Sequence, residues 1–274
     1  MRRKPLGLLG GLLLLAMLAL AVLASHIAPY GYDEADIFSR LQSGSAAHWL
    51  GTDNLGRDLL SRVIYGARVS VAVGLGSVAL GLGLATAVGL LSGYFGGRLD
   101  LLVQRLVDAF MCFPLLLVAL TIMALLGPGL ENVILTLGLV LGIRDSRVIR
   151  SAVLTVKAHP YLEAARALGA THGRMIRRHV LPNILAPVII LATVNLGGVI
   201  LTEAALSFLG FGVPPPRPSW GGMLSGAGVV HMLRAPWLAL WPGVALSLAV
   251  FGANMLGDAL RDVLDPRLRG RQGH

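Results

Sequence analysis

The chain has 274 residues, of which 55% are hydrophobic and only 14% are charged, and its mean hydropathy is +0.74. A soluble domain of this length cannot cover so much apolar surface, whereas a lipid bilayer can, so the composition predicts a membrane protein. The formal net charge of +9 does not indicate a nucleic-acid partner. The basic residues lie in clusters beside apolar segments, and they form no single stripe with interleaved aromatic residues.

The usage of cysteine, lysine and histidine argues against several kinds of site. The single cysteine, Cys112, lies in an apolar run, so we expect no disulfide and no paired thiolate site. The only lysines, Lys4 and Lys157, do not belong to a phosphate-binding glycine-rich motif, so we expect that this chain binds no ATP. The seven histidines show no clustered ligand spacing, and no metal site is expected.

Six apolar segments approach or exceed the length of about 20 residues that a membrane-spanning helix needs. Their expected bounds are residues 6–27, 69–95, 102–126, 131–149, 183–211 and 237–259. The sequence therefore predicts an all-α membrane protein with six transmembrane helices. We expect two parts. Residues 1–68 hold the first helix and an external amphipathic segment, and residues 69–274 hold a core of five helices with a polar loop at 150–182.

The first segment follows Arg2, Arg3 and Lys4 and could be a secretory signal. Its apolar run is longer than the central region of a typical signal, and five more apolar segments follow. We therefore interpret it as a membrane span, in which Gly7 would face lipid.

Residues 48–70 are expected to form an amphipathic helix at the outer membrane surface. Thr52 or Asp53 can cap this helix, and Asp58 and Arg62 have the spacing of an ion pair on one helical face. Its apolar face would consist of Leu55, Leu59, Val63 and Ala67.

The second apolar segment carries a small residue at every fourth position. These residues are Ser77, Gly81, Ala85, Gly89, Gly93 and Gly97. Such a ladder lets another helix approach closely. We expect the four glycines to pack against a neighbouring helix.

The third and fourth segments each carry charged residues. Asp108 lies one turn after Arg105, and we expect it to make a structural ion pair near the cytoplasmic surface, with a place on a polar path across the membrane as the alternative. Arg144, Arg147 and Arg150 fall on one helical face at the end of the fourth segment. This pattern predicts a helix that leaves the bilayer there, with arginines reaching to the lipid headgroups.

Residues 161–183 are polar and rich in arginine, between long apolar segments. A helix is expected around Glu163, a sharp turn at Gly169, and a second, basic helix to about Val180 before Pro182 starts the next element. A helix–turn–helix of this kind suits docking into a groove of another protein. The residues expected to carry this role are Glu163, Ala164, Ala165, Gly169, Arg174, Leu181 and Pro182.

The distribution of basic residues orients the segments. With the N-terminus inside, the cytoplasmic parts hold 17 Lys and Arg and the outer loops hold 6. The positive-inside rule then places both termini and the 150–182 loop in the cytoplasm.

Glu203 stands in the middle of the fifth segment, where a charge costs about 2.5–3.5 kcal/mol. The favoured interpretation is a structural hydrogen bond, to Thr202 or Asn195. The alternative is that Glu203 lines a translocation path and meets a cationic ammonium group, with Asn195 as a further residue of that path.

Four motifs together resemble one protein family. The order E-A-A-x3-G-x9-x-x-L-P at residues 163–182 resembles the coupling loop of ATP-binding-cassette (ABC) importer permeases, where the permease grips its ATPase. Three further stretches resemble the C-type subunit of dipeptide and oligopeptide permeases. These are HWLGTDNLGRDLLSRVIYGARVS (48–70), SFLGFGVPPPRPSWGGML (207–224) and NMLGDALRDVLDPRLR (254–269).

The resemblance implies a type I importer permease with a cytoplasmic coupling helix, in the inner membrane of a prokaryote. Such a subunit translocates dipeptides or oligopeptides and has no chemistry of its own. The implied partners are a second homologous permease subunit, two cytoplasmic ABC ATPases that bind ATP and Mg, and an extracytoplasmic solute-binding protein.

Other functions stay open at this point. Nickel or another small solute could replace the peptide within the same family. An intramembrane enzyme would need two catalytic groups at one depth, as in a G-x-S-x-G or H-E-x-x-H motif, and neither motif is present. A channel or a proton-driven carrier would leave the 163–182 motif without a purpose.

Overall fold

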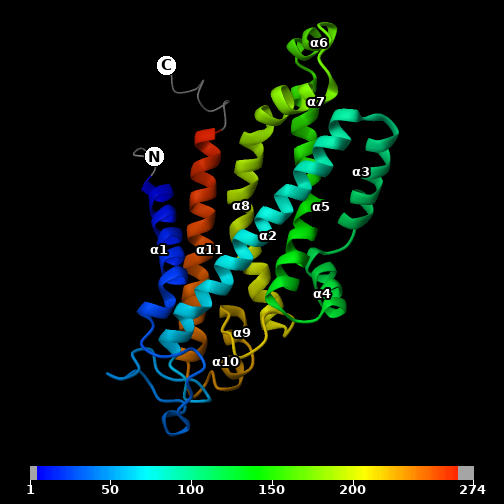
Figure 1. The fold of residues 1–274 in the computed structure, drawn as a ribbon. Coiled ribbons are helices and arrows are strands. Elements are labelled where there is room, and N and C mark those ends of the chain that lie inside the picture. Colours follow the sequence, from blue (N-terminus) through cyan, green and yellow to red (C-terminus); the bar gives the residue numbers. More distant parts are fainter. Residues whose placement is uncertain (1–4, 265–274) are drawn as a thin grey trace.

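The structure is a computed structural model that describes residues 5–264. Within these residues the chain is a bundle of long helices, and no β-strand forms beyond one isolated bridge between Thr52 and Asp58. The predicted all-α fold is confirmed. Figure 1 shows that α6 lies at one end of the bundle, together with the first turn of α1 and the last turn of α11, while α9 and α10 lie at the other end.

Five long helices make up the bundle, and shorter elements connect them. The long helices are α1 (Pro5–Ile27), α2 (Leu59–Phe95), α5 (Leu130–Lys157), α8 (Leu181–Phe208) and α11 (Trp237–Leu264). The shorter elements are η1 (Ile37–Ser39), α3 (Gly97–Met111), α4 (Leu115–Leu126), α6 (Pro160–Ala167), α7 (His172–Met175), the π-helical η2 (Ile176–Val180), α9 (Trp220–Leu224) and α10 (Ala227–Val230).

Among the residues described, four helices have the length and composition to cross a membrane. They are α1, α2, the helix that runs from His172 through α8, and α11. Helices α3 and α4 together would add a fifth span, but they are bent by 92° at the break between them. The prediction of one continuous third helix over 102–126 is therefore wrong. Pro114 stands at the bend and is the N-cap of α4, where it has no amide N–H to donate to a preceding turn.

Helix α2 contains the second predicted span and ten further residues before it. Asp58 is its N-cap, and the carboxylate accepts a hydrogen bond from the Ser61 amide at 2.7 Å. The expected surface helix with a cap at Thr52 or Asp53 is therefore wrong: residues before Asp58 form turns, and Arg62 pairs with Asp53, not with Asp58. The division expected at residues 68 and 69 falls inside this one helix.

The small residues of α2 let α5 approach closely. A Cβ atom added at Gly89 would lie 2.5 Å from the Ser146 carbonyl oxygen, and one added at Gly81 would lie 2.8 Å from Leu141 Cδ2. At Gly93 the nearest atoms belong to Val153, at 3.1 Å.

Two features of this contact differ from the prediction. Gly97 begins α3 with φ +61°, and an added Cβ would meet nothing within 4 Å, so it does not pack on a neighbouring helix. Helix α5 also contributes glycines of its own: Gly138 and Gly142 receive Leu80 and Leu84 of α2. The interface is therefore reciprocal, with small residues on both helices.

A second close contact joins α1 to α11. A Cβ added at Gly7 would lie 2.2 Å from the Ala259 Cβ, and one at Gly10 would lie 2.7 Å from the Gly252 carbonyl oxygen. The expectation that Gly7 faces lipid is wrong. Helix α11, far away in sequence, covers this side of α1.

Candidate functional site

Helix α6 presents an exposed face at one end of the bundle. Pro160 occupies its first turn, which fits its fixed φ and missing amide hydrogen. Leu162 is buried, whereas Glu163 and Ala164 are exposed and Ala165 is half-buried. No side chain caps the helix, and Glu163 makes no hydrogen bond or ion pair with any residue of 5–264. The acidic side chain is thus free for an external partner.

The turn after α6 is closed by two backbone hydrogen bonds. The Ala170 amide donates to the Ala165 carbonyl at 3.1 Å and the Gly169 amide donates to the Arg166 carbonyl at 3.0 Å. Gly169 has φ +80°, a left-handed conformation that glycine adopts at little cost. The predicted turn at Gly169 is confirmed. Thr171 then caps α7.

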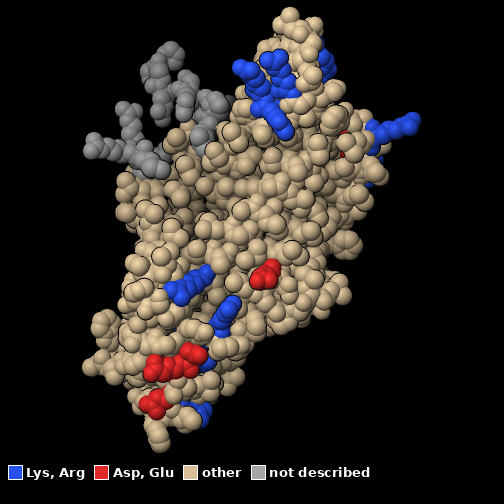
Figure 2. Space-filling model, in the orientation of Figure 1, with Lys and Arg blue, Asp and Glu red and all other residues tan. Residues whose placement is uncertain are grey.

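Helix α7 continues through η2 into α8 without interruption. The residues at both junctions of η2, Met175 and Leu181, have right-handed helical dihedrals. The expected basic helix is present, but its expected end near Val180 is wrong, because the helical backbone continues into α8, whose first turn contains Pro182. Arg174 is exposed on this helix. Figure 2 shows basic side chains gathered over this end of the molecule.

The other side of the segment is anchored in the bundle. Met175 and Val180 are fully buried in one cluster with Ile149 and Val153 of α5. The ring of His172 receives or donates a hydrogen bond with the Tyr94 hydroxyl at 2.9 Å. A movement of α6 and α7 would therefore displace the parts of α2, α5 and α8 that contact them.

Three arginines of α5 bind acidic residues, two of which lie on α3 and one on α5 itself. Arg150 contacts Asp100 of α3 through two hydrogen bonds of 2.5 Å, and Arg147 pairs with Asp108 of α3. Arg144 contacts Asp145 at 2.9 Å. The expected ion pair of Asp108 is thus present. Each of the three arginines has a carboxylate partner, which the sequence did not indicate, and their contact with lipid headgroups stays a prediction.

Asn195 links α8 to this polar region. Its side-chain oxygen accepts from Arg144 at 2.7 Å, and its amide nitrogen donates to Asp145. Asn195 therefore belongs to a network of opposite charges. A part for Asn195 or Asp108 in a translocation path stays a prediction.

Glu203 is fully buried in α8, and Ser207 Oγ donates to its Oε1 at 2.7 Å. The expectation of a partner at Thr202 or Asn195 is wrong, since Thr202 Oγ1 donates to the Gly198 carbonyl instead. Its Oε2 has no partner among the residues described. In this conformation Glu203 is sealed from solvent, and its role in a path stays a prediction.

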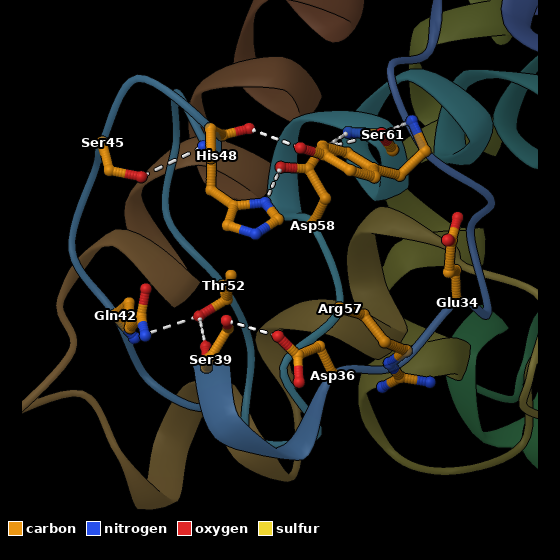
Figure 3. Close-up of polar contacts among 12 residues, drawn as sticks. Glu34, Asp36, Ser39, Gln42, Ser45, His48, Thr52, Arg57, Asp58 and Ser61 are labelled. Carbon is orange, nitrogen blue, oxygen red and sulfur yellow. Dashed lines mark hydrogen bonds and ion pairs between the residues drawn. The ribbon is translucent and has the colours of Figure 1, made fainter.

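A compact polar cluster lies at the opposite end of the bundle, before α2 (Figure 3). His48 Nδ1 lies 3.0 Å from Asp58 Oδ1, and the other oxygen of Asp58 accepts from the Ser61 amide and hydroxyl. The Ser39 hydroxyl donates to Asp36 at 2.6 Å, and together with the Phe38 amide it holds the pKa of the Asp36 carboxyl below its ordinary value.

Sequence reasoning missed this cluster. Its only signal was the pair His48 and Asp58, ten residues apart and joined by turn-forming residues. Among residues 5–264, no group of three or more His, Cys, Asp or Glu is arranged to hold a metal ion.

Two protein families match parts of the chain. The family described as binding-protein-dependent transport system inner membrane component matches residues 85–270. The family described as the N-terminal TM domain of oligopeptide transport permease C matches residues 1–43.

Several characterised proteins are similar over almost the whole chain. The dipeptide transport system permease protein DppC of Alkalihalophilus pseudofirmus is 40% identical over 98% of this chain and 88% of its own length. The glutathione transport system permease protein GsiD of Pectobacterium atrosepticum is 38% identical, covering 97% of this chain and 89% of that protein. GsiD of Escherichia coli O6:K15:H31 is also 38% identical, over 98% of this chain and 89% of that protein.

A solved structure shares the fold. It is a chain of the MetNI methionine ABC transporter in an inward-facing conformation, with a TM-score of 0.60 and 19% sequence identity. The match covers 74% of this chain and 96% of the other. The expected permease fold is thereby confirmed.

Proposed function

The chain belongs to the family of binding-protein-dependent transport system inner membrane components, and from that premise we propose that it is a permease subunit of an ATP-driven peptide importer. The names of its relatives support peptides as the solute, since they specify dipeptide and glutathione transport. Nickel or another small solute is the alternative within the family.

The observation that carries the proposal is the exposed α6 segment. Glu163 has no partner within residues 5–264, although the segment is firmly anchored beneath it. An exposed acid on an anchored helix is suited to pair with a cation on a second protein. We assign that protein as a cytoplasmic ABC ATPase, one of two that bind ATP and Mg in place of this chain.

The remaining partners follow from the same proposal. A second homologous permease subunit would complete the path, and an extracytoplasmic binding protein would deliver the solute. The excess of basic residues, 17 against 6, supports an inner-membrane orientation with α6 and both termini in the cytoplasm. Closure of the two ATPases on ATP would pull the α6 segments together, and the continuous α7–α8 helix would carry that movement into the bundle. Hydrolysis of ATP would return the ATPases and the bundle to the starting conformation.

A charge reversal tests the coupling role. We expect Glu163→Lys to leave the permease in the membrane, to abolish uptake of a labelled dipeptide and to release the co-expressed ATPase during purification. Glu131→Lys is the matched control, because Glu131 is also exposed in the first turn of a helix but lies at the opposite end of the bundle. Retention of the ATPase and of uptake in Glu163→Lys would exclude α6 as the coupling site.

The solute is tested separately with the intact transporter. Uptake of a labelled dipeptide, glutathione and Ni²⁺ is measured in parallel in membrane vesicles. We expect the dipeptide or glutathione to accumulate in an ATP-dependent manner. Accumulation of Ni²⁺ alone would replace the peptide assignment by the alternative.

A further inference from the structure

A cavity of about 380 Å³ lies near the end of the bundle opposite α6. Two arginines and two tyrosines line it: Tyr65 and Arg68 of α2, Tyr32 of the segment before α2, and Arg217 of the loop between α8 and α9. The remaining lining is mostly apolar and includes Leu130 at the start of α5. No acidic residue is part of this lining. Two positive charges therefore share one cavity without a carboxylate in its wall.

Arg68 is fixed in place but not neutralised. Its Nε donates to the Ala21 carbonyl at 2.7 Å and its Nη2 to the Ser25 hydroxyl at 3.2 Å. The guanidinium lies over the Tyr65 ring, 5.1 Å from the centroid. All these partners are uncharged, so they orient the guanidinium and leave its full positive charge at the cavity.

Arg217 is the second charge, and it lies in the loop between α8 and α9. Prolines at 216 and 218 flank it, and because proline fixes φ they restrict the backbone that carries the guanidinium. The side chain is exposed, and it makes no hydrogen bond or ion pair with any residue of 5–264. Its donors are free for a ligand.

The two tyrosines supply neutral donors beside the charges. Their rings meet edge-to-face with centroids 5.1 Å apart. Neither hydroxyl hydrogen-bonds to another residue in the described part of the chain. A phenol O–H can donate to an anion, and both positive charges in the cavity lining would attract that anion.

We propose that this cavity binds the free carboxylate of a peptide on its way into the transporter, an assignment that rests on the proposed function. Arginine matches a carboxylate with two parallel hydrogen bonds, which suits planar recognition. The volume lies at the lower end of the range for small-molecule pockets and so suits a short peptide. With α6 in the cytoplasm, the cavity faces the side from which the solute arrives.

The test compares one dipeptide with its C-terminal amide, which lacks the negative charge. The complete transporter is reconstituted in vesicles with saturating binding protein, and the uptake of both compounds is measured for the wild type and for Arg217→Gln. Loss of one charge-assisted hydrogen bond should lower uptake of the free acid about tenfold relative to the amide.

Two further variants sharpen this comparison. Arg234→Gln removes an exposed arginine of the same outer region that does not line the cavity, and it should leave the acid-to-amide ratio unchanged. Tyr65→Phe removes only a hydroxyl and should lower the ratio about threefold. This milder variant keeps the edge-to-face contact with Tyr32, so it tests the site even if Arg217→Gln assembles poorly.

The outcomes separate the two claims. An equal fall for acid and amide, as binding of a lipid phosphate or a structural role would produce, would overturn the carboxylate site and leave the transport function standing. An unchanged ratio in both Arg217→Gln and Tyr65→Phe would do the same. Absence of any peptide uptake by the wild type would contradict the proposed function and the site together.

Discussion

Asp100 of α3 and Arg150 of α5 form a two-point ion pair, in which Nε and Nη2 of the arginine each donate to one carboxylate oxygen at 2.5 Å. Helix α3 buries little else, since Val107 is its one buried residue in the structure. The position of α3 therefore depends on polar contacts with α5, of which the pair between Asp108 and Arg147 is the second.

This dependence predicts a measurable coupling between the two residues. We expect Asp100→Asn and Arg150→Gln each to lower the thermal stability of the detergent-solubilised protein, and the double variant to be less destabilised than the sum. A two-point pair that is partly screened by solvent gives a coupling of about 1–2 kcal/mol in a double-mutant cycle. Arg105→Gln, at an exposed position on the same helix, is the control. Strict additivity would show that the pair does not hold α3.

The close crossing of α2 and α5 predicts different effects at two glycines of one helix. Gly89→Leu should separate the helices, because even a Cβ there would lie 2.5 Å from a backbone oxygen of α5. Gly83→Leu should be tolerated, since an added Cβ meets nothing within 4 Å. The yield of folded protein after detergent extraction, measured by size-exclusion chromatography, distinguishes them. Similar yields for both variants would show that the crossing is not tight.

The orientation of the molecule can be tested with two single cysteines. In a Cys112→Ala background, Ala46→Cys should react with an impermeant maleimide on intact cells, and Gly173→Cys only after permeabilisation. Both positions are exposed, so accessibility itself does not limit labelling. The prediction follows from the distribution of basic residues. Labelling of Gly173→Cys from outside would reverse the orientation and remove α6 from the cytoplasm.

The turn between α6 and α7 predicts a strong effect at Gly169. Valine there must adopt a positive φ, which costs about 1–3 kcal/mol, so Gly169→Val should distort the turn, abolish uptake and release the ATPase. Gly173 lies four residues later, in a right-handed helix and open to solvent, so Gly173→Val should retain both uptake and the bound ATPase. Co-purification of the ATPase with each variant is the measurement. If Gly169→Val retained the ATPase and uptake in full, the turn would not be needed for coupling.

Two replacements of Glu203, one isosteric and one smaller, should change the thermal stability of the protein differently. Glu203→Gln can keep the hydrogen bond from Ser207 and removes an ionisable group from a fully buried position, so thermal stability should be equal or higher. Glu203→Ala leaves the Ser207 hydroxyl without its acceptor and opens a small cavity, so stability should fall by about 1–3 kcal/mol. If uptake falls in Glu203→Gln while stability and ATPase binding persist, the carboxylate has a role in transport; unchanged uptake would exclude that role.

Local features of the fold were predictable because they depend on local rules. The turn at Gly169 follows from glycine's access to positive φ. The small-residue ladder predicted a close helix contact, and Gly81, Gly89 and Gly93 make it. The ladder did not identify α5 as the partner, because spacing within one helix says nothing about its neighbour.

Other features depend on contacts between distant segments. Arg147 and Arg150 looked like residues at a membrane surface, because their partners Asp108 and Asp100 lie some forty to fifty residues earlier. Gly7 looked lipid-facing for the same reason. The bend before α4 combines a local cause, Pro114, with packing that no periodicity reveals, since each half is helical by itself.

The π-helical turn at η2 sets the direction in which the side chains of α7 point relative to those of α8. An α-helix advances by about 100° per residue, so residues five positions apart point about 140° away from each other on a regular helix, whereas the wider π turn absorbs one additional residue and keeps them on one face. Met175 and Val180, at the two ends of this turn, both point into the same buried cluster. Deleting one residue between them would leave these two residues four positions apart on a regular α-helix, about 40° from each other, so both would stay in the cluster and the exposed arginines of α7 would keep their orientation. The orientation of the exposed face of α7 therefore depends on the π conformation of these five residues, because an α-helical turn of the same residues would rotate that face by about 100° relative to α8.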